Sequence, residues 1–479
     1  MDAITSSRMA AIDANCEYLG IKGLQLMENA GAAVANAVKK RFKSAKIIII
    51  AGRGNNGGDA FVAARHLGSY DTKVLLIGQK ENIRTEEAKH NWNALEKTRI
   101  PLIQVTDSTA FDSSMIKNAD IIIDGIFGTG IKGEINQPES TAIDIINGSD
   151  AFVVSVDIPS GFDPDGGGKA VNADLTITFH KMKAGMQDAR KYTGEIEVAD
   201  IGIPEEAEFF VGPGDIKPFL KRSIVSHKGD AGRVLVIGGG AYSGAPALCA
   251  FAALRAGADI VTVAAPESVS DIIASFSPDI IVRPLSGDRL TEDDVPLLSG
   301  LIEKHDVVVM GMGLGTSDET LATVKKIVPL CRKAVIDADA LQPFLLPLFH
   351  KNIILTPHAG EMKRISGSDV PEGEEKVDFT RNFADEHDVT VLLKGAVDII
   401  SDGMEVRANR TGNAGMTVGG TGDVLAGLTG ALFAKHNAFE AAGAAAFING
   451  AAGDMAFLES GYGLLATDVI NHIPQVMKA

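Results

Sequence analysis

The chain has 479 residues, of which 45% are hydrophobic and 22% charged, and its formal net charge at pH 7 is −17. This length predicts more than one domain, and the composition excludes an intrinsically disordered chain. The negative charge argues against a nucleic-acid partner, because contacts with a phosphate backbone need clustered Lys and Arg.

The amino-terminal segment MDAITSSRMA has no basic region followed by an apolar core, so we expect no secretory signal. The most apolar longer stretch, residues 247–265, is interrupted by Arg255 and Asp259, so we expect no membrane span. The three cysteines are far apart and odd in number, which suits a reducing compartment and predicts neither a disulfide framework nor a zinc site. Together these features predict a soluble, cytoplasmic protein.

In the first half, apolar runs alternate with amphipathic segments, which predicts strands with helices between them. The run KIIIIAG lacks polar alternation, as is typical of a parallel strand buried on both faces. Helices are expected at residues 23–42 and 61–67. The expected strands are KIIIIAG (46–52), KVLLIG (73–78), ADIIIDGIFG (119–128), AFVVSVDIPSG (151–161), DLTITFH (174–180) and GEIEVADIGIP (194–204). This pattern predicts a Rossmann-like α/β domain of three layers.

The first of these strands leads into the motif AGRGNNGGD, residues 51–59. Its GxGxxG spacing alone would fit a dinucleotide-binding loop, but Asp59 would repel a pyrophosphate bound at the start of the helix. We interpret Asn55, Asn56 and Asp59 as polar groups on a loop whose glycines allow close approach of a ligand. A plain helix-capping role for Asp59 is the alternative.

Polar side chains also follow two later strands. Asp124 ends the run 119–128 and opens a glycine loop that contains Thr129, Lys132 and Glu134, whereas Asp157 and Ser160 end the run 151–161. The carboxyl ends of parallel strands form the ligand crevice of such sheets. We therefore expect these residues and the motif NNGGD to converge at one edge of the sheet.

After a cluster of prolines and glycines at residues 203–218, the alternation of strand and helix restarts, which predicts domains at residues 1–212 and 220–479. The second domain is also α/β, and it ends in alanine-rich helices at residues 422–436 and 439–457, after an earlier helix at residues 245–258. Its expected strands are RVLVIGGG (233–240), DIVTVAAP (259–266), DVVVMGMGLG (306–315), KAVIDADAL (333–341), NIILTP (352–357) and VTVLLKGAVDII (389–400).

The segment NAGMTVGGTGDVLAG, which begins at Asn413, predicts an anion site. Small residues 419–422 enter a helix, so free backbone N–H groups would point at an anion. Asp423 follows in the first turn, where the helix dipole favours its ionised form. Amides beside a carboxylate are what phosphoryl transfer to an alcohol requires, since the carboxylate accepts the hydroxyl proton. A capped, glycine-rich helix start is the structural alternative.

Across residues 1–212, AGRGNNGGD, DGIFGTGIKGE and VDIPSG resemble the motifs of the NAD(P)H-hydrate epimerase family. The resemblance implies interconversion of R- and S-NADHX or NADPHX, the hydrated reduced cofactors, with Asp157 as the acid/base group. It implies a potassium ion held by Asn56, Asp124 and Ser160. By position in the motifs, the implied substrate contacts are Asn55, Asn56, Gly57, Gly58, Asp59, Gly128, Thr129, Gly130, Ile131, Lys132, Gly133, Glu134 and Asp157.

Across residues 220–479, GMGLG, DADAL, TPHAGEM, LLKGAVDII and NAGMTVGGTGDVLAG resemble, in this order, the nucleotide-dependent NAD(P)H-hydrate dehydratases, which are ribokinase-like. The resemblance implies that ADP, or ATP in some members, phosphorylates the S epimer, that loss of phosphate restores the nicotinamide, and that Mg²⁺ accompanies the nucleotide. Asp423 would be the base and would face the substrate with Gly313 and His358. The implied nucleotide contacts are Lys394, Gly395, Ala396, Val397, Asp398 and Gly422.

Three readings compete with a bifunctional repair enzyme that acts on NADHX or NADPHX with ADP. A ribokinase-like small-alcohol kinase with a regulatory Rossmann-like domain would explain GGTGD but not NNGGD or VDIPSG. A first domain that only binds a ligand would make Asp157 dispensable. An NAD-dependent dehydrogenase is disfavoured by Asp59. We expect a homo-oligomer with small-molecule substrates and no membrane or nucleic-acid partner.

Overall fold

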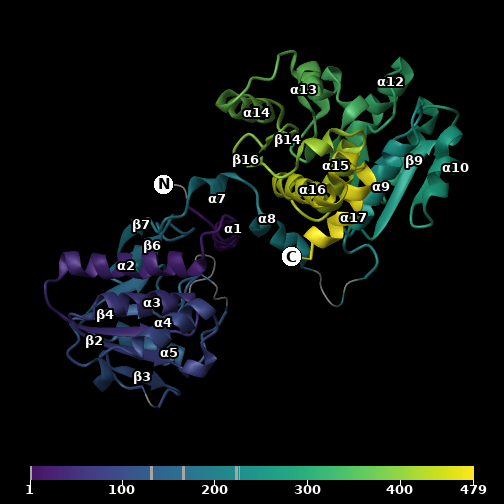
Figure 1. The fold of residues 1–479 in the computed structure, drawn as a ribbon. Coiled ribbons are helices and arrows are strands. Elements are labelled where there is room, and N and C mark those ends of the chain that lie inside the picture. Colours follow the sequence, from purple (N-terminus) through teal and green to yellow (C-terminus); the bar gives the residue numbers. More distant parts are fainter. Residues whose placement is uncertain are drawn as a thin grey trace. The chain divides into compact units, whose positions relative to one another are not determined.

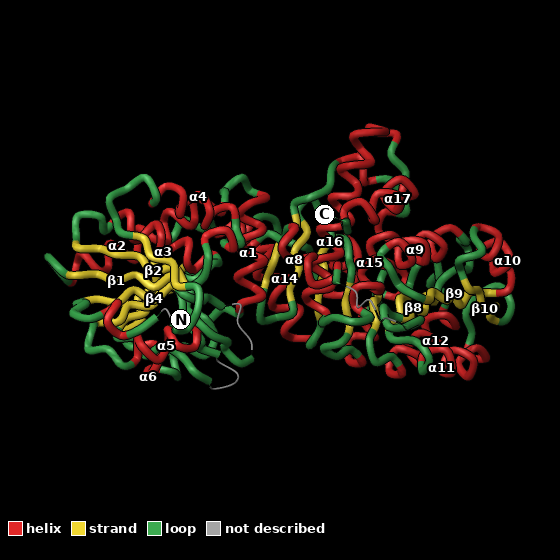
Figure 2. The backbone as a smooth tube through the Cα atoms, turned by 90° about the horizontal axis from the view of Figure 1, so that it is seen from below, coloured by secondary structure: helices red, strands yellow, loops and turns green. Residues whose placement is uncertain are grey.

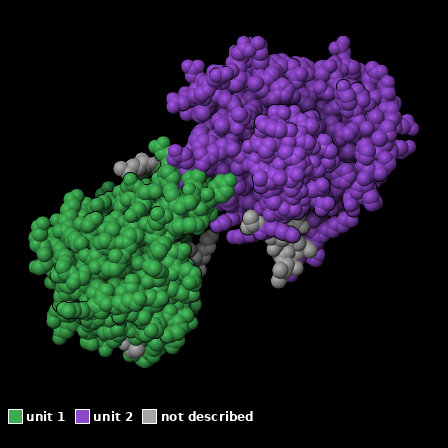
Figure 3. Space-filling view, viewed as in Figure 1, with its two compact units in different colours: residues 1–205 green, residues 206–479 purple. Residues whose placement is uncertain are grey.

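The computed structural model describes residues 3–109, 111–129, 133–163, 168–221, 225 and 227–478. Contacts divide the chain into two compact units, residues 1–205 and 206–479, which Figure 3 distinguishes by colour. Each unit has its own sheet and its own buried core.

The first unit is built on a seven-stranded sheet of order β3-β2-β1-β4-β5-β6-β7, in which all neighbouring strands are parallel. This confirms the predicted Rossmann-like layer arrangement, and Figure 1 shows the sheet with its helices. The strands are β1 (Lys46–Ala51), β2 (Asp71–Ile77), β3 (Leu102–Val105), β4 (Ile121–Gly125), β5 (Phe152–Val156), β6 (Leu175–Phe179) and β7 (Glu195–Ala199). The sequence prediction missed β3, which has only four residues and is not fully buried.

Helices cover both faces of this sheet. Successive isoleucines of β1 alternate between the faces, and Ile48 and Ile50 pack with Ile143 and Ile146 of α5. On the other face α3 lies between α2 and α4 and contacts β1. The helices are α1 (Ser6–Tyr18), α2 (Gly23–Arg41), α3 (Asn55–His66), α4 (Glu86–Leu95), α5 (Glu139–Asn147), α6 (Arg190–Thr193) and, across the boundary, α7 (Glu205–Phe209).

The second unit has a nine-stranded sheet of order β10-β9-β8-β11-β12-β13-β14-β15-β16, parallel except for the antiparallel pairs β14–β15 and β15–β16. Figure 2 shows β8, β9 and β10 side by side. The strands are β8 (Arg233–Ile237), β9 (Ile260–Pro266), β10 (Ile281–Leu285), β11 (Val307–Met310), β12 (Ala334–Ile336), β13 (Ile353–Leu355), β14 (Thr390–Leu393), β15 (Asp398–Ser401) and β16 (Val406–Asn409).

The prediction of one strand-like run at 389–400 was wrong. The chain turns at residues 394–397, so the run becomes two antiparallel strands, β14 and β15. The prediction also missed β10 and β16, in each of which only some residues are buried. These edge strands lack the continuous apolar signal of the central strands.

Two layers of helices enclose this sheet. Val234 and Val236 of β8 face the core shared with α9, α15, α16 and α17, while Leu235 and Ile237 face the opposite layer. The helices are α8 (Pro213–Ile216), α9 (Gly244–Arg255), α10 (Glu267–Phe276), α11 (Val295–Ile302), α12 (Asp318–Ile327), α13 (Ala359–Ser366), α14 (Glu374–His387), α15 (Thr421–Phe433), α16 (Ala438–Ser460) and α17 (Ala466–Val476).

The most apolar long helix is α16, not the segment 247–265 that the sequence suggested. Among the described residues, the stretch Ala438–Gly463 alone has the length and composition of a membrane span, but 72% of its most apolar window is buried inside the protein. Its alanines pack in the core beside α15 and α17, as expected of a helix that is apolar on all sides.

Candidate active sites

The motif NNGGD forms the first turns of α3, so its predicted location on a loop was wrong. Gly54 is the N-cap, and Asp59 is the fifth residue of the helix and caps nothing. The glycines allow close packing, because a Cβ on Gly57 would lie 2.0 Å from the carbonyl oxygen of Gly52. The start of α3 therefore packs tightly against the end of β1.

The predicted convergence at the carboxyl ends of the strands is present in part: it does not include Glu134, and Lys132 lies outside the described residues. The sheet order reverses between β1 and β4, which is where ligands bind in open α/β sheets. The side chain of Asn56 donates to the carbonyl oxygen of Phe127 over 2.8 Å, and the N–H of Phe127 donates to Oγ of Ser160 over 2.8 Å. Asn56 and Ser160 thus meet at the loop that follows Asp124.

Asp124 is a fully buried carboxylate at the end of β4. It accepts hydrogen bonds from Oγ of Ser155 (2.9 Å) and from N and Oγ of Ser160 (2.8 and 2.5 Å). Burial raises the pKa of Asp124, although these donors lower it in part. No cationic side chain pairs with it among the described residues, so a monovalent cation between these oxygen atoms fits the arrangement.

A cavity of about 500 Å³ opens at this edge of the sheet. Six of the residues singled out as substrate contacts line it: Asn55, Asn56, Asp59, Gly128, Thr129 and Asp157. Gly57 and Gly58 are buried in α3 behind this wall, and Gly133 and Glu134 are exposed outside it. Gly130, Ile131 and Lys132 lie outside the described residues.

Asp157 directly follows β5 and has a φ of 62°, in the left-handed region that non-glycine residues rarely adopt. Such backbone strain is common at functional sites. This conformation places its carboxylate against Lys183, whose ammonium lies 2.5 Å from Oδ1. Thr178 Oγ1 and Phe179 N also contact that oxygen, at 3.2 and 3.3 Å.

The sequence prediction missed Lys183, which is only 5% exposed and lines the same cavity. Its ammonium also donates to the carbonyl oxygen of Phe179, over 2.8 Å. Lys183 follows the end of β6, as Asp157 follows the end of β5, while Asp124 lies in the last two residues of β4. The same rule about strand ends could therefore have identified it.

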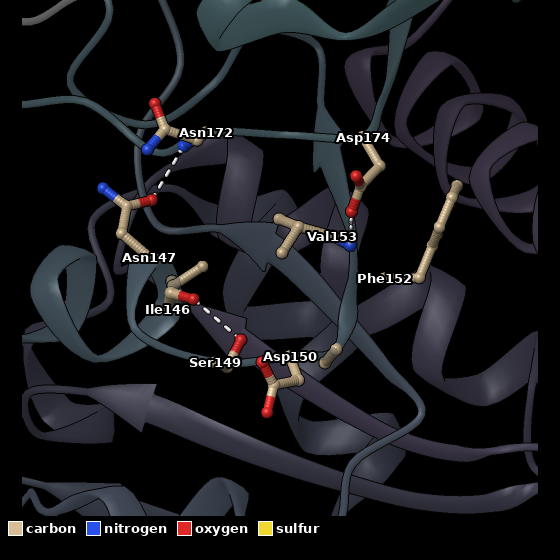
Figure 4. Close-up of a pocket in the computed structure, with 9 residues that line it drawn as sticks. Ile146, Asn147, Ser149, Asp150, Phe152, Val153, Asn172 and Asp174 are labelled. Atoms are coloured by element: carbon tan, nitrogen blue, oxygen red, sulfur yellow. Dashed lines mark hydrogen bonds between the residues drawn. The ribbon is translucent and has the colours of Figure 1, made fainter.

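A second hollow in this unit, of about 380 Å³, lies at the opposite edge of the sheet near the start of β5. Figure 4 shows that its polar groups hydrogen-bond to one another: Asn172 N donates to Asn147 Oδ1, and Val153 N donates to Asp174 Oδ2. None of the predicted site residues lines it.

In the second unit, α15 begins directly after Gly420, which adopts a φ of 100°. The backbone N–H groups of Thr421, Gly422 and Asp423 have no acceptor within the described part of the chain. They are the free donors expected at a helix start, so an anion could bind there. This agrees with the predicted anion site.

A charged cluster surrounds this helix start. The ammonium of Lys394 lies 3.0 Å from Oδ1 of Asp337 and 3.6 Å from Oε2 of Glu361. A Cβ on Gly422 would lie 3.5 Å from that ammonium, so the cation lies against the first turn of α15. Burial alone would lower the pKa of Lys394, but the carboxylates of Asp337, Glu361 and Asp423 outweigh it and raise the pKa.

Asp423 is half-buried and faces this cluster rather than open solvent. Burial, followed by repulsion from Asp337, raises its pKa to about 7, although Lys394 acts in the opposite direction. The expectation that the helix dipole would favour the ionised form was therefore incomplete, because desolvation outweighs the dipole. A carboxyl group with this pKa suits a general base near neutral pH.

His358 acts as the N-cap of α13. Its Nδ1 accepts hydrogen bonds from the N–H groups of Gly360 (3.0 Å) and Glu361 (3.3 Å), and Oε2 of Glu361 accepts from the N–H of His358 (2.8 Å). His358 and Glu361 thus form a reciprocal capping box at the start of α13. The imidazole is 60% exposed, and its Nε2 lies 3.4 Å from Oε1 of Glu361.

The loop after β11 lies where the second sheet reverses its order, between β8 and β11. Gly313 has a φ of 65° there, and Asp339 holds the loop by accepting a hydrogen bond from Gly315 N over 2.8 Å. Met312 is fully buried in the core, and its carbonyl oxygen accepts a hydrogen bond from Gly239 N over 2.9 Å.

Of the expected nucleotide contacts, residues 394–397 form the turn between β14 and β15, and Asp398 is the first residue of β15. Asp398 closes this turn, because its carboxylate accepts from Gly395 N and from Asn409 Nδ2, each over 2.9 Å. Lys376 donates to the carbonyl oxygen of Val397 over 2.7 Å. Val397 itself is 40% exposed, so it stands at the surface beside Lys394.

Comparison with known proteins adds independent findings. A family model described as NAD(P)H-hydrate dehydratase matches residues 234–475, and one described as YjeF-related protein N-terminus matches residues 23–185. The chain is 46% identical to the bifunctional NAD(P)H-hydrate repair enzyme Nnr of Archaeoglobus fulgidus, with 100% of this chain and 99% of that protein covered.

The enzyme of the same name from Methanothermobacter thermautotrophicus is also 46% identical, with 98% of this chain and 94% of that protein covered. Among solved structures, a hypothetical protein of Streptococcus mutans matches 56% of this chain and 98% of its own length, with 30% identity and a TM-score of 0.51.

Proposed function

Because the chain belongs to the family of bifunctional NAD(P)H-hydrate repair enzymes, we propose which of its residues perform each reaction. The enzyme repairs hydrated nicotinamide cofactors: an amino-terminal epimerase interconverts R- and S-NAD(P)HX, and a carboxy-terminal ADP-dependent dehydratase restores NAD(P)H from the S epimer. The pairing has a chemical reason. A dehydratase that accepts one epimer needs a partner activity that supplies it from the other.

In the epimerase, Asp157 acts as the acid/base group at the hydrated carbon. The supporting observation is its place in the cavity wall, where a strained backbone holds it against Lys183. Lys183 is a positioning residue in this proposal, because its ammonium fixes the carboxylate and compensates its charge. Substrate lies along Asn55, Asn56, Asp59, Gly128 and Thr129.

We assign the potassium ion of the epimerase to Asn56, Asp124 and Ser160. The buried carboxylate of Asp124 has hydroxyl and amide donors but no cationic partner within the described residues, and Asn56 and Ser160 lie beside it. Hard monovalent cations prefer such oxygen ligands. A bound ion would compensate the buried negative charge and order the loop that follows β4.

In the dehydratase, Asp423 accepts the proton of the substrate hydroxyl while the free amides of α15 and the ammonium of Lys394 hold the transferred phosphoryl group. Gly313 and His358 border the substrate, and the turn 394–398 with Gly422 borders ADP. The hydroxyl becomes a phosphate ester, and phosphate is a far better leaving group than hydroxide. Its departure restores the nicotinamide ring.

Magnesium bound with the nucleotide would supply charge neutralisation at the phosphate oxygens. Within the described residues no three His, Cys, Asp or Glu side chains are grouped to hold a metal ion by themselves. This suits an ion that takes most of its ligands from phosphate and water, as Mg²⁺ commonly does. Asp337 and Glu361, next to Lys394, are the carboxylates that could contribute.

The observation that carries the dehydratase assignment is the position of Asp423, half-buried at a helix start with unpaired amides and next to Lys394. A small-alcohol kinase with a regulatory domain would use the same features. Relatives at 46% identity over essentially the whole chain are repair enzymes, however, and the kinase reading leaves the cavity of the first unit without a function.

The test is conversion of a racemic hydrate of NADH by the purified protein with ADP and Mg²⁺, followed by absorbance of the reduced nicotinamide. We expect complete conversion by the wild type, conversion of about half by Asp157→Asn, and none by Asp423→Asn. Release of a stable phosphoester would instead support the kinase. Full conversion by Asp157→Asn would contradict the assigned epimerase residue.

We also propose a cytoplasmic location and a homo-oligomeric assembly. NAD(P)H and ADP are intracellular metabolites, and the three cysteines are free and buried, as suits a reducing compartment. Cell fractionation and light scattering of the purified protein would test the two statements separately.

A further inference from the structure

Asp59 stands apart from the other carboxylates of the epimerase cavity. It is 9% exposed and lines the cavity wall, yet it has no hydrogen-bond or ion-pair partner among the described residues. Asp157, in the same wall, is paired with Lys183 at 2.5 Å. A buried acid without a partner is costly to ionise, so such groups are kept where function requires them.

The surroundings of Asp59 favour its neutral form. Burial is the largest cause and raises its pKa well above the ordinary value, and repulsion from Asp157 and Asp13 adds to it. Lys183 acts in the opposite direction but is engaged by Asp157. The cavity wall contains further charged groups on the neighbouring segments: Arg53, Arg84, Glu87 and Glu139.

The cavity therefore offers two carboxyl groups in different surroundings: Asp157 is paired with Lys183, and Asp59 has no partner among the described residues. Asp59 comes from the second turn of α3 and Asp157 from the end of β5. Pairs of acids whose surroundings differ in this way can divide the roles of acid and base between them. We propose that Asp59 is the proton donor of the epimerase and that Asp157, held by Lys183, is the proton acceptor.

The reaction balances as follows for one direction. Asp59 gives its proton to the departing hydroxyl, the C–O bond breaks, and water leaves with the bonding electron pair. The lone pair of the ring nitrogen forms a C=N bond, which leaves a cation between two carboxylates. Water then adds to the other face of that carbon, forms a new C–O bond and gives a proton to Asp157. In the reverse direction Asp157 donates the proton and Asp59 accepts it. After each turnover, exchange with solvent removes the proton from Asp157 and returns one to Asp59.

The inference rests on the proposed role of Asp157, and Asp59→Asn in the full-length chain tests it. The amide keeps the shape of the side chain but has no acidic proton to give. We expect kcat for R to S conversion to fall by about 10²- to 10⁴-fold, the usual contribution of a general acid, with KM changed less than about threefold. In the wild type, kcat should decline at high pH as Asp59 loses its proton, and this decline should be absent from the variant.

The dehydratase provides an internal control, because Asp59→Asn should convert pure S epimer as fast as the wild type. Asp71→Asn, at the exposed start of β2, is the matched control and should leave both activities unchanged. The inference is overturned if Asp59→Asn epimerises at the wild-type rate, or if only KM rises. It is also overturned if the lower rate accompanies a lower melting temperature and is matched by Asp59→Glu, since that indicates a packing role.

Failure of the epimerase assignment itself would give assay results that differ from failure of the role proposed for Asp59. If the wild type does not convert the R epimer at all, or if Asp157→Asn is fully active, the epimerase assignment fails before Asp59 is considered. If the wild type is active and only the two aspartate variants lose turnover, the division into donor and acceptor is supported.

Discussion

At the scale of single residues, burial determines what the carboxyl groups of this protein can do. Asp423 and Asp59 both have raised pKa values, and desolvation is the first cause for each. Asp423 lies beside the ammonium of Lys394 and reaches a pKa of about 7, which suits a base. Asp59 has no such partner among the described residues, which suits an acid.

The pKa of Asp423 predicts how dehydration depends on pH. A base must be deprotonated, so kcat/KM for the S epimer should be constant above about pH 7 and fall about tenfold per pH unit below it. Initial rates measured with ADP and Mg²⁺ between about pH 5.5 and 8.5 test this prediction, because the range extends to both sides of the pKa of about 7. A flat profile across this range would exclude Asp423 as the base.

At the scale of elements, glycines place the helices that carry the sites. A Cβ on Gly427 of α15 would lie 2.0 Å from the carbonyl oxygen of Cys249 in α9, and one on Gly430 would lie 2.3 Å from Val309 of β11. These contacts let α15 sit tightly between a helix and the sheet. The position of Asp423 in the first turn of α15 depends on this packing.

Gly427→Ala should therefore destabilise the second unit, by roughly 3 kcal/mol, because a backbone carbonyl cannot move aside as a flexible side chain can. Dehydration should fall, while epimerisation should not change. The measurements are thermal unfolding and both rates.

Gly300→Ala is the matched control for this experiment. Gly300 lies in α11, and a Cβ at this position would have no atom within 4 Å, so alanine should stabilise the helix by about 0.5–1 kcal/mol. Equal unfolding temperatures for the two variants would contradict the packing explanation.

At the scale of the whole molecule, each unit has a complete sheet and core. Residues 206–220, which precede the first strand of the second unit, belong to that unit by their contacts. Val211 and Ile216 are buried in the core of the second unit, and Asp215 forms an ion pair with Arg407 at 3.0 Å. Val211 N also donates to the carbonyl oxygen of Ala408.

These contacts predict where the dehydratase can be separated from the epimerase. A fragment that begins at residue 206, where the compact units divide, should dehydrate the S epimer. A fragment that begins at residue 220, the boundary expected from sequence, lacks both core residues and the carboxylate of Asp215 that pairs with Arg407. Its loss of stability should be about 5 kcal/mol, or roughly 10 °C or more in melting temperature. Equal melting temperatures would favour the later boundary.

The sequence by itself determined the alternation of strand and helix in both units, the parallel sheet of the first unit and the places where glycine motifs follow strands. These features depend on neighbours along the chain, and the runs KIIIIAG and RVLVIGGG display them directly. It also indicated which strand ends carry Asp124 and Asp157, because parallel strands end at one edge of a sheet.

Only the tertiary structure decided which charged groups meet and in what state. Asp13, Asp59, Asp157 and Lys183 come from four separate segments, and their ion pair and repulsions exist only once those segments pack together. The same holds for Lys394, Asp337 and Asp423. A pKa depends on desolvation and on distances between residues far apart in sequence, and no local pattern in the chain contains either quantity.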